Sequence, residues 1–288
     1  MEGGIGGKEG TTCGTFDLNA LPQDFIAVVL SFTSPRDACR LSLVSTTFKS
    51  AADSDTVWES FLPSEYQAFS SLSFSSKKEL YLSLCENPVL VDGGRKSFSL
   101  DRGSGKKCYM LSARDLYIVW SDTPTYWRWV SIPESRFEEV AELISVCWVE
   151  IRGKISISML SPMTHYKAYL VFKAATGAYG FEFQPVEVSV GLVGTEGRKR
   201  TVYLDSERGG RQRRRIAPWR IGLQASAPSG VSDDQFPKVR VDGWLEIELG
   251  EFFNEGCVDG ELEMSVLEVK GGHWKGGLVI QGIEMRPN

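Results

Sequence analysis

The sequence predicts an α+β protein with two domains, a small all-α helical domain followed by an antiparallel β-sandwich of jelly-roll type. Start signals for short helices crowd the first part of the chain. From Cys108 onward the pattern changes to roughly ten short runs in which apolar and polar residues alternate, separated by turn residues. At 288 residues the chain is long enough for two domains, one with a substantial core.

The chain begins with a glycine-rich segment, residues 1–15, which has no apolar periodicity and is expected to be a flexible tail. The helical domain is predicted over residues 16–62. Pro22 fits the first position of a helix, and Asp24 falls in the first turn, where the helix dipole favours an anion. This helix carries apolar residues on two sides, so we expect one side to pack inside the domain and the other against a further surface.

Two more helix starts are visible in this domain. Ser34 is predicted to be an N-cap, with Asp37 three residues beyond it, and helical spacing continues as far as Phe48. Ser54 or Asp55 is predicted to cap a last short helix. A unit of this size buries little surface, so it is expected to depend on a partner or a neighbouring domain.

Residues 63–105 are predicted to form a structured connector between the two domains. A helical pattern covers Lys77–Cys85 and is stopped by the dipeptide Asn87-Pro88. A strand is predicted from Val89, with Lys96–Leu100 pairing back onto it.

The β-sandwich is predicted over residues 106–288. Its last stretch, residues 239–287, holds three alternating runs with no helix between them, which predicts antiparallel pairing. A short helical turn is predicted at Glu138–Leu143. The other strands are predicted at residues 116–120, 127–131, 146–151, 154–160, 168–174, 186–193 and 200–205.

Hydropathy and cysteine spacing limit the class of protein. The longest apolar run, Phe25–Leu30, has six residues, so no membrane insertion is expected, and no secretory signal opens the chain. The six cysteines show no Cys-x-x-Cys pair and no compact spacing, which is typical of proteins in a reducing compartment. We therefore expect the protein in the cytoplasm and nucleus.

The sequence contains no catalytic or cofactor-binding pattern. With two histidines and no cysteine/histidine cluster, it predicts no metal site. Glu246 and Glu248 would face the same side of a strand, as a glycosidase pair does, but the surface carboxylates of most strands do the same. We expect a non-catalytic protein that needs no cofactor.

A basic segment contrasts with the net charge of −5. Residues 198–215 hold eight basic and two acidic residues. One interpretation is a solvated hairpin loop, and the other is a surface for nuclear import or polyanion binding. No nucleic-acid partner is expected. The candidate patch is formed by Arg211, Arg213, Arg214 and Arg215.

Trp120, Trp127 and Trp129 lie within ten residues of one another, beside Asp122 and Tyr126. An exposed aromatic ring offers a flat apolar surface to the C–H face of a pyranose, and nearby carboxylates bind its hydroxyls. Periodicity alone favours burial instead, since Trp127 and Trp129 share one face of a strand and Trp120 is in phase with apolar neighbours. The remaining tryptophans of this domain are expected to be structural: Trp148, Trp219 and Trp274 in the core, and Trp244 in packing between domains.

The pattern Val-Trp-Ser-Asp-x-Pro-x-Tyr-Trp-x-Trp at residues 119–129, with the blocks Cys147–Ile155, Tyr166–Lys173 and 239–287, resembles the phloem-lectin (Nictaba) family of plant proteins. In that family the tryptophans matching Trp120 and Trp127 stack on the ligand. The resemblance implies binding of N-acetylglucosamine oligomers and N-glycan cores.

The dipeptide Leu21-Pro22, the step Ser34–Asp37, the turn Leu43–Ser45 and Trp58 together resemble an F-box. An F-box implies docking onto a Skp-type adaptor and, through a cullin, membership of an SCF ubiquitin ligase. Each residue of the corresponding surface could equally lie in the core of the domain. The family's adaptor surface corresponds to Leu21, Pro22, Ile26, Leu30 and Val44.

The two resemblances lead to one hypothesis. The protein is expected to be the substrate-recognition adaptor of an SCF ubiquitin ligase, holding the ligase through the F-box and a glycan or glycoprotein through the lectin domain. One alternative keeps the ligase role with a purely protein target. Another is a nucleocytoplasmic stress-related lectin that has no ligase role.

Overall fold

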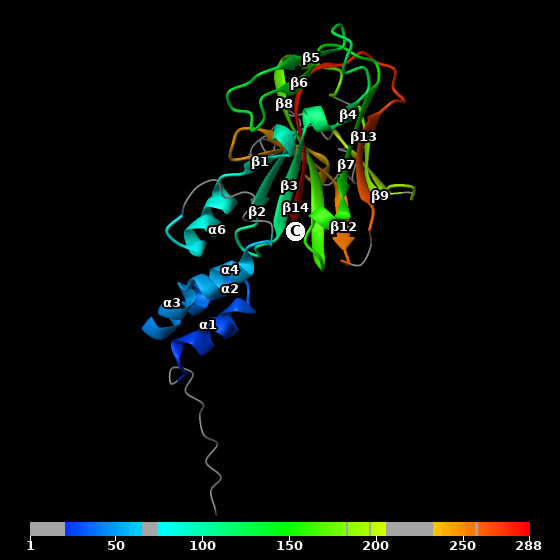
Figure 1. The fold of residues 1–288 in the computed structure, drawn as a ribbon. Coiled ribbons are helices and arrows are strands. Elements are labelled where there is room, and N and C mark those ends of the chain that lie inside the picture. Colours follow the sequence, from blue (N-terminus) through cyan, green and yellow to red (C-terminus); the bar gives the residue numbers. More distant parts are fainter. Residues whose placement is uncertain (1–20, 65–73, 183, 196, 206–232, 257–258) are drawn as a thin grey trace, which may run out of the picture. The chain divides into compact units, whose positions relative to one another are not determined.

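The computed structural model describes residues 21–64, 74–182, 184–195, 197–205, 233–256 and 259–288. The chain folds as two compact units, Met1–Tyr81 and Leu82–Asn288. The first unit holds short helices and the second is dominated by antiparallel strands (Figure 1). The predicted fold class is therefore confirmed. The expected tail, residues 1–15, lies outside the described residues.

Short helices with serine caps build the first unit. The hydroxyl of Ser34 accepts a hydrogen bond from the backbone N–H of Asp37 at 3.1 Å, which confirms the predicted cap. Ser45 accepts from the N–H of Phe48 at 3.3 Å, so a new helix begins where the sequence suggested a continuation. Pro22 stands at the N-cap, one position earlier than predicted. The helices are α1 (Gln23–Ser31), α2 (Pro35–Leu41), α3 (Thr46–Ala52) and α4 (Asp55–Phe61).

An aromatic centre joins α4 to the next helix that the structure describes, α6 (Lys77–Glu86). Trp58 is buried and donates its indole N–H to the carbonyl oxygen of Ala52 at 2.7 Å. Its ring lies 5.1 Å from that of Tyr81, centroid to centroid. One face of α6 is buried, since Leu80, Tyr81 and Leu84 are all shielded from solvent.

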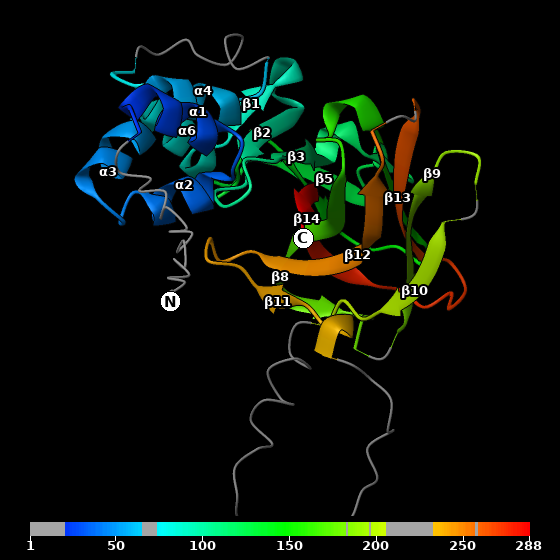
Figure 2. The same ribbon diagram turned by 90° about the horizontal axis from the view of Figure 1, so that it is seen from below.

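In its described residues the second unit is a sandwich of two antiparallel sheets, of nine and five strands. Figure 2 shows β8, β12 and β11 side by side in one sheet and β13, β9 and β10 in the other. The larger sheet has the order β1 (Val89–Val91), β2 (Lys96–Leu100), β3 (Lys107–Ser112), β14 (Gly276–Pro287), β8 (Thr164–Tyr179), β12 (Leu245–Asn254) and β11 (Lys238–Val239), with β5 (Trp127–Val130) and β6 (Val140–Leu143) attached through β14. The smaller sheet has the order β10 (Arg198–Val202), β9 (Val186–Leu192), β13 (Glu261–Glu268), β7 (Val149–Ser156) and β4 (Tyr117–Ile118).

Several elements differ from the sequence prediction. The segment predicted as a helical turn at Glu138–Leu143 contains strand β6, because it pairs on one side with β5 and on the other with β14. The two strands predicted at 146–151 and 154–160 form the single strand β7. Gly153 lies inside β7 and marks no turn. A Cβ there would approach Leu116 to 2.9 Å, so the glycine permits this close packing. Strands β1 and β2 pair as expected and belong to the nine-stranded sheet.

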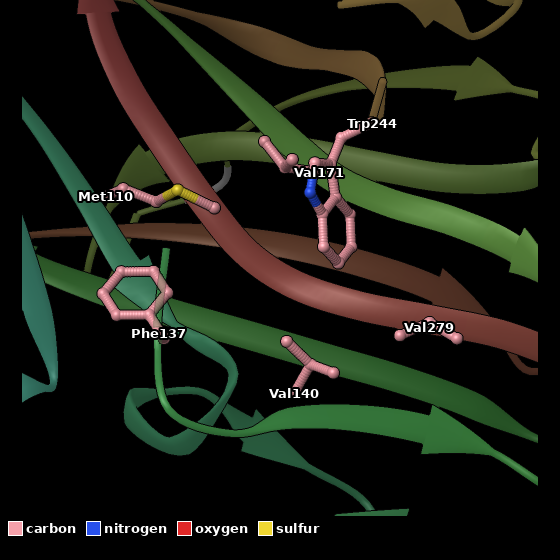
Figure 3. Packing of buried hydrophobic residues seen from close by; sticks show 6 residues of the cluster. All are labelled: Met110, Phe137, Val140, Val171, Trp244 and Val279. Carbon is pink, nitrogen blue, oxygen red and sulfur yellow. The ribbon is translucent and has the colours of Figure 1, made fainter. Parts of the chain in front are cut away.

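A tryptophan fills one part of the sandwich core. Trp244 is fully buried and donates its indole N–H to the carbonyl oxygen of Glu134 at 3.1 Å. It packs within the sandwich, which corrects its assignment to a domain interface. Figure 3 shows the cluster gathered around β14 from several strands: Met110, Phe137, Val140, Val171, Trp244 and Val279.

Neither a membrane span nor a metal site is found in the described part of the chain. Each helix there is too short or too polar to cross a bilayer. Within the same residues, no three His, Cys, Asp or Glu side chains are grouped as metal ligands. The cysteines of this part, Cys39, Cys85, Cys108 and Cys147, are free thiols.

Candidate functional site

An exposed apolar surface lies on the helical unit. Residues at four positions of α1 and its C-cap point to solvent, with exposed fractions from 49% for Val28 to 86% for Phe32. The turn between α2 and α3 adds two more apolar side chains. We call this surface the apolar face: Phe25, Val28, Val29, Phe32, Leu43 and Val44. Burial of such a surface against a partner is favourable, at roughly 25 cal/mol per Å².

The residues predicted for adaptor binding divide between surface and core. Pro22 and Val44 are exposed, and Leu21 is half-buried. Ile26 and Leu30 are only 2% and 0% exposed, so they hold the helical unit together and present no surface to an adaptor. Both sides of α1 are apolar, and the sequence alone did not indicate which of them faces inward.

An exposed aromatic cluster lies on the sandwich, in the loop between β4 and β5 and the segment that enters β7. The ring of Trp120 lies 5.3 Å from that of Tyr126 and 6.5 Å from that of Trp148, centroid to centroid. Trp120 is 40% exposed and Trp148 is 42% exposed. We call Trp120, Tyr126 and Trp148 the aromatic cluster. Neither Trp120 nor Trp148 is buried. The burial that periodicity favoured for Trp120 is therefore not found, and the assignment of Trp148 to the core is corrected.

A tight turn presents Trp120 to solvent. Its φ of +61° lies in the left-handed region, which disfavours side chains other than glycine. The turn is closed by a hydrogen bond from the N–H of Thr123 to the carbonyl oxygen of Trp120 at 2.9 Å. The backbone therefore adopts a costly conformation that leaves the indole ring outside the core.

Two other tryptophans support this loop from beneath. Trp127 is 2% exposed and donates its indole N–H to the carbonyl oxygen of Val119 at 3.1 Å. Trp129 donates to the carbonyl oxygen of Ser121 at 3.1 Å. The two bonded carbonyls flank Trp120 in the chain. Trp127, predicted to stack on a sugar, is therefore a buried support of the loop, and its ring faces are covered.

Carboxylates stand beside the aromatic cluster. Asp122 is exposed in the same loop as Trp120. Glu150 accepts a hydrogen bond from the indole N–H of Trp148 at 3.3 Å and another from Nε of Arg152 at 2.7 Å. The cluster thus combines flat apolar rings with hydrogen-bonding groups, the combination that binds sugars.

Trp274, which the sequence assigned to the core, is 57% exposed. It lies in the glycine-rich loop between β13 and β14, between Gly272 and Gly276. The flanking glycines are typical of a loop, so the sequence did contain a signal that Trp274 is exposed. Trp219 lies outside the described residues.

The paired carboxylates of β12 are engaged in ion pairs. Glu246 binds Arg286 at 2.7 Å and Arg240 at 2.9 Å. Glu248 binds Lys167 at 3.3 Å and also pairs with Arg200. They line a pocket of about 160 Å³ whose basic side chains already have acidic partners. The arrangement fits structural charges rather than a glycosidase pair.

A neighbouring ion network centres on Glu284, which is nearly buried. Arg240 contacts its carboxylate at 2.6 Å, Arg136 at 3.2 Å and Arg286 at 3.3 Å. Burial alone would raise the pKa of Glu284, but the charge and hydrogen bond of Arg240, with the charges of Arg136 and Arg286, hold its pKa below the ordinary value of 4.5.

Only the first part of the basic segment is described. Arg198, Lys199 and Arg200 lie on β10 and form ion pairs with Glu251, Glu187 and Glu248. Three of the eight basic residues are therefore partly neutralised. The predicted patch, Arg211, Arg213, Arg214 and Arg215, lies outside the described residues.

Comparison with known families gives two matches along the chain. Residues 18–60 match the F-box domain, and residues 106–287 match the family described as Phloem protein 2. The first match covers the apolar face and the second covers the aromatic cluster. Neither description names an enzymatic family.

Similar proteins from Arabidopsis thaliana share both parts. The chain is 51% identical over 283 residues to F-box protein At2g02240, covering 98% of this chain and 83% of that protein. It is 49% identical to F-box protein PP2-B1, covering 96% of this chain and 91% of that protein. It is also 49% identical to F-box protein PP2-B10, covering 93% of each.

Proposed function

Because the chain belongs to the F-box proteins that carry a C-terminal phloem protein 2 domain, we propose that it is the substrate-recognition adaptor of an SCF-type ubiquitin ligase. The F-box holds a Skp-type adaptor and, through it, the cullin. The sandwich binds a glycan or glycoprotein that contains N-acetylglucosamine. The protein itself performs no chemical step, and it works in the cytoplasm and nucleus.

The observation that carries this proposal is the apolar face within the F-box. Six large apolar side chains lie exposed on a unit whose core is already filled by Ile26, Leu30 and Trp58. A protein surface is the occupant that suits them, since these apolar side chains offer no hydrogen bonds to a polar ligand. The Skp-type adaptor is the partner that F-box membership implies.

The aromatic cluster supports the second half of the proposal. Trp120 and Trp148 offer ring faces to a pyranose, and Asp122 and Glu150 stand beside them as acceptors for hydroxyl and amide groups. A millimolar sugar contact supplies only about 4 kcal/mol. Protein contacts or several glycans on one target would add to it.

The proposed mechanism is tethering. With a target held on the sandwich and the ligase held on the F-box, transfer of ubiquitin becomes effectively intramolecular. The protein's contribution is then the local concentration of the target, so a loss of either surface abolishes ubiquitination while the ligase remains intact.

The adaptor half is tested by titrating a purified Skp-type adaptor into the full-length chain in a calorimeter. Val29→Asp places a charge in the apolar face and is expected to weaken binding at least about 100-fold, because a buried unpaired charge costs several kcal/mol. Lys49→Asp, at an exposed position outside that face, is the matched control. Equal affinities of wild type and Val29→Asp would contradict the proposed surface.

The glycan half is tested by titrating the full-length chain with chitotriose and with a high-mannose N-glycan. Trp120→Ala is expected to abolish measurable binding in a protein whose near-UV spectrum is otherwise retained. If the wild type binds neither sugar but still captures the adaptor, the sandwich would recognise a purely protein target instead. Failure to capture the adaptor would favour the lectin without a ligase role.

A further inference from the structure

A second group of exposed large side chains comes from segments that meet near the start of β14. Trp274, Tyr179 and Ile144 are all exposed. Gly276 pairs with Tyr179 in the sheet register. A Cβ at position 276 would come within 2.3 Å of the Ile144 carbonyl oxygen and 3.0 Å of Cε1 of Tyr179, so the Tyr179 ring lies directly against the backbone of this glycine.

Tyr179 is held at its polar end. Its hydroxyl forms a hydrogen bond of 2.7 Å with the hydroxyl of Ser145. The contact with Gly276 fixes the position of the ring, and the hydrogen bond fixes the tip. This leaves a partly exposed aromatic face with two hydroxyl groups at its edge, which is the composition of a sugar-binding surface.

A buried lysine connects this second group to the aromatic cluster. Lys275 is fully buried and forms an ion pair with buried Glu268. Its ammonium group donates to the carbonyl oxygens of Cys147 at 3.1 Å and His273 at 2.6 Å. These two carbonyls belong to the peptide bonds that precede Trp148 and Trp274. The two backbone segments are therefore no farther apart than one ammonium group can bridge.

Backbone pairing strengthens this connection. Val146 and Lys275 exchange hydrogen bonds in both directions, at 2.9 and 2.8 Å. Glu268 also accepts from the N–H of Gly271 at 3.0 Å and from the amide of Gln184 at 3.2 Å. The loop between β13 and β14 is thus bonded at several points, at the end of the sandwich that is uppermost in Figure 1. A surface held in this way loses little conformational entropy on binding a ligand.

We propose that Trp274 and Tyr179 form a second sugar subsite, contiguous with the aromatic cluster, so that one oligosaccharide lies across both. The proposal rests on the proposed glycan-binding function and assigns to it residues that the sequence pattern at 119–129 does not include. The occupant is a pyranose ring, because Lys275 joins the backbone segments that carry Trp148 and Trp274, and the hydroxyl groups of Tyr179 and Ser145 lie together at the edge of an exposed ring. The second subsite adds affinity only for ligands longer than one sugar.

Calorimetry on the full-length chain separates the two subsites. Wild type, Trp120→Ala and Trp274→Ala are each titrated with N-acetylglucosamine and with chitotriose. Trp274→Ala is expected to weaken chitotriose binding about tenfold, the loss of one stacking contact, and to leave monosaccharide binding unchanged. Trp120→Ala is expected to abolish measurable binding of both sugars. Phe253→Ala, which removes a ring exposed elsewhere on β12, is the matched control and should change neither.

The outcomes distinguish this inference from the function on which it rests. If Trp120→Ala weakens binding and Trp274→Ala binds chitotriose as wild type does, the second subsite is overturned and the glycan function stands. A loss in Trp274→Ala alone would overturn the aromatic cluster as the primary site, and with it the proposal of one ligand lying across both. If the wild type binds neither sugar, both are overturned.

Discussion

The helical unit and the sandwich expose different kinds of apolar surface. The apolar face of the helical unit consists of valines, leucine and phenylalanine, with no polar group among the side chains that form it. The sandwich exposes several tryptophan and tyrosine rings, and among them the indole N–H of Trp148 bonds to Glu150 and the hydroxyl of Tyr179 to Ser145. The first composition suits a protein interface and the second suits a sugar. One chain thus presents two surfaces that do not compete for the same ligand.

The two units also differ in where they place charge. The ion pairs of the helical unit, such as Lys78 with Asp53 and Arg40 with Asp37, are exposed and contribute little stability. The sandwich instead buries Lys275 with Glu268, and nearly buries Glu284 among arginines. Substitutions of charge are therefore expected to affect the sandwich far more than the helical unit.

The largest effect is expected from Lys275→Met. Removing the lysine leaves Glu268 as an unpaired buried charge, which costs about 3–5 kcal/mol of unfolding free energy. Hydrogen exchange followed by mass spectrometry should show lost protection in β13 and β14 and unchanged protection in α1–α4. Lys238→Met, in an exposed pair with Asp234, is the control and should change stability by less than about 1 kcal/mol. Equal protection in both variants would show that the buried pair Lys275–Glu268 stabilises the sandwich no more than an exposed pair does.

A smaller effect, about 3 kcal/mol, is expected from Leu30→Ala, because it opens a cavity in the core of the helical unit. Val29→Ala, the exposed neighbour in the same helix, should change stability by about 0.5 kcal/mol or less. Hydrogen exchange of α1 and α4 measures both. Adaptor binding should show the opposite order. Val29→Ala should weaken it more than Leu30→Ala does, because Val29 is exposed on the apolar face. A Leu30→Ala protein as stable as wild type would contradict the division of α1 into a core side and a binding side.

Acid should destabilise the sandwich through Glu284. A carboxyl group whose pKa is lower in the folded state stabilises it above the unfolded pKa, and this contribution is lost as the pH falls through the folded pKa. The loss should therefore begin below about pH 4.5. Glu284→Gln should cost about 2 kcal/mol at pH 7 and show a shallower decline between roughly pH 5 and pH 3. Urea unfolding at each pH measures both, and parallel pH profiles for the two proteins would refute the assignment.

Local signals in the sequence predicted the helices well. The cap at Ser34 and the helix α6 depend on neighbouring residues only, and both are confirmed. The inward side of α1 was not predictable, since Ile26 and Val29 are equally apolar and only the packing of α3 and α4 decides between them. The inward side of α1 is therefore set by tertiary contacts and not by helix propensity.

The aromatic site was only partly predictable for a similar reason. Alternation assigns sides within a strand, but Trp148 precedes β7 and Trp274 lies in a loop, where that period carries no information. The family pattern located Trp120 and the loop around it, whereas burial of Trp127 depends on its bond to Val119. The pairing of β6 with β14, between segments distant in sequence, likewise left no local signal.

The left-handed backbone at Trp120 has an evolutionary consequence. A tryptophan loses about 1–2 kcal/mol there, so Trp120→Gly relieves strain while it removes the ring. Selection for a stable fold and selection for the indole therefore act in opposite directions at this one position. If the proposed sugar binding is lost in a copy of this gene, glycine at position 120 relieves the strain at no functional cost.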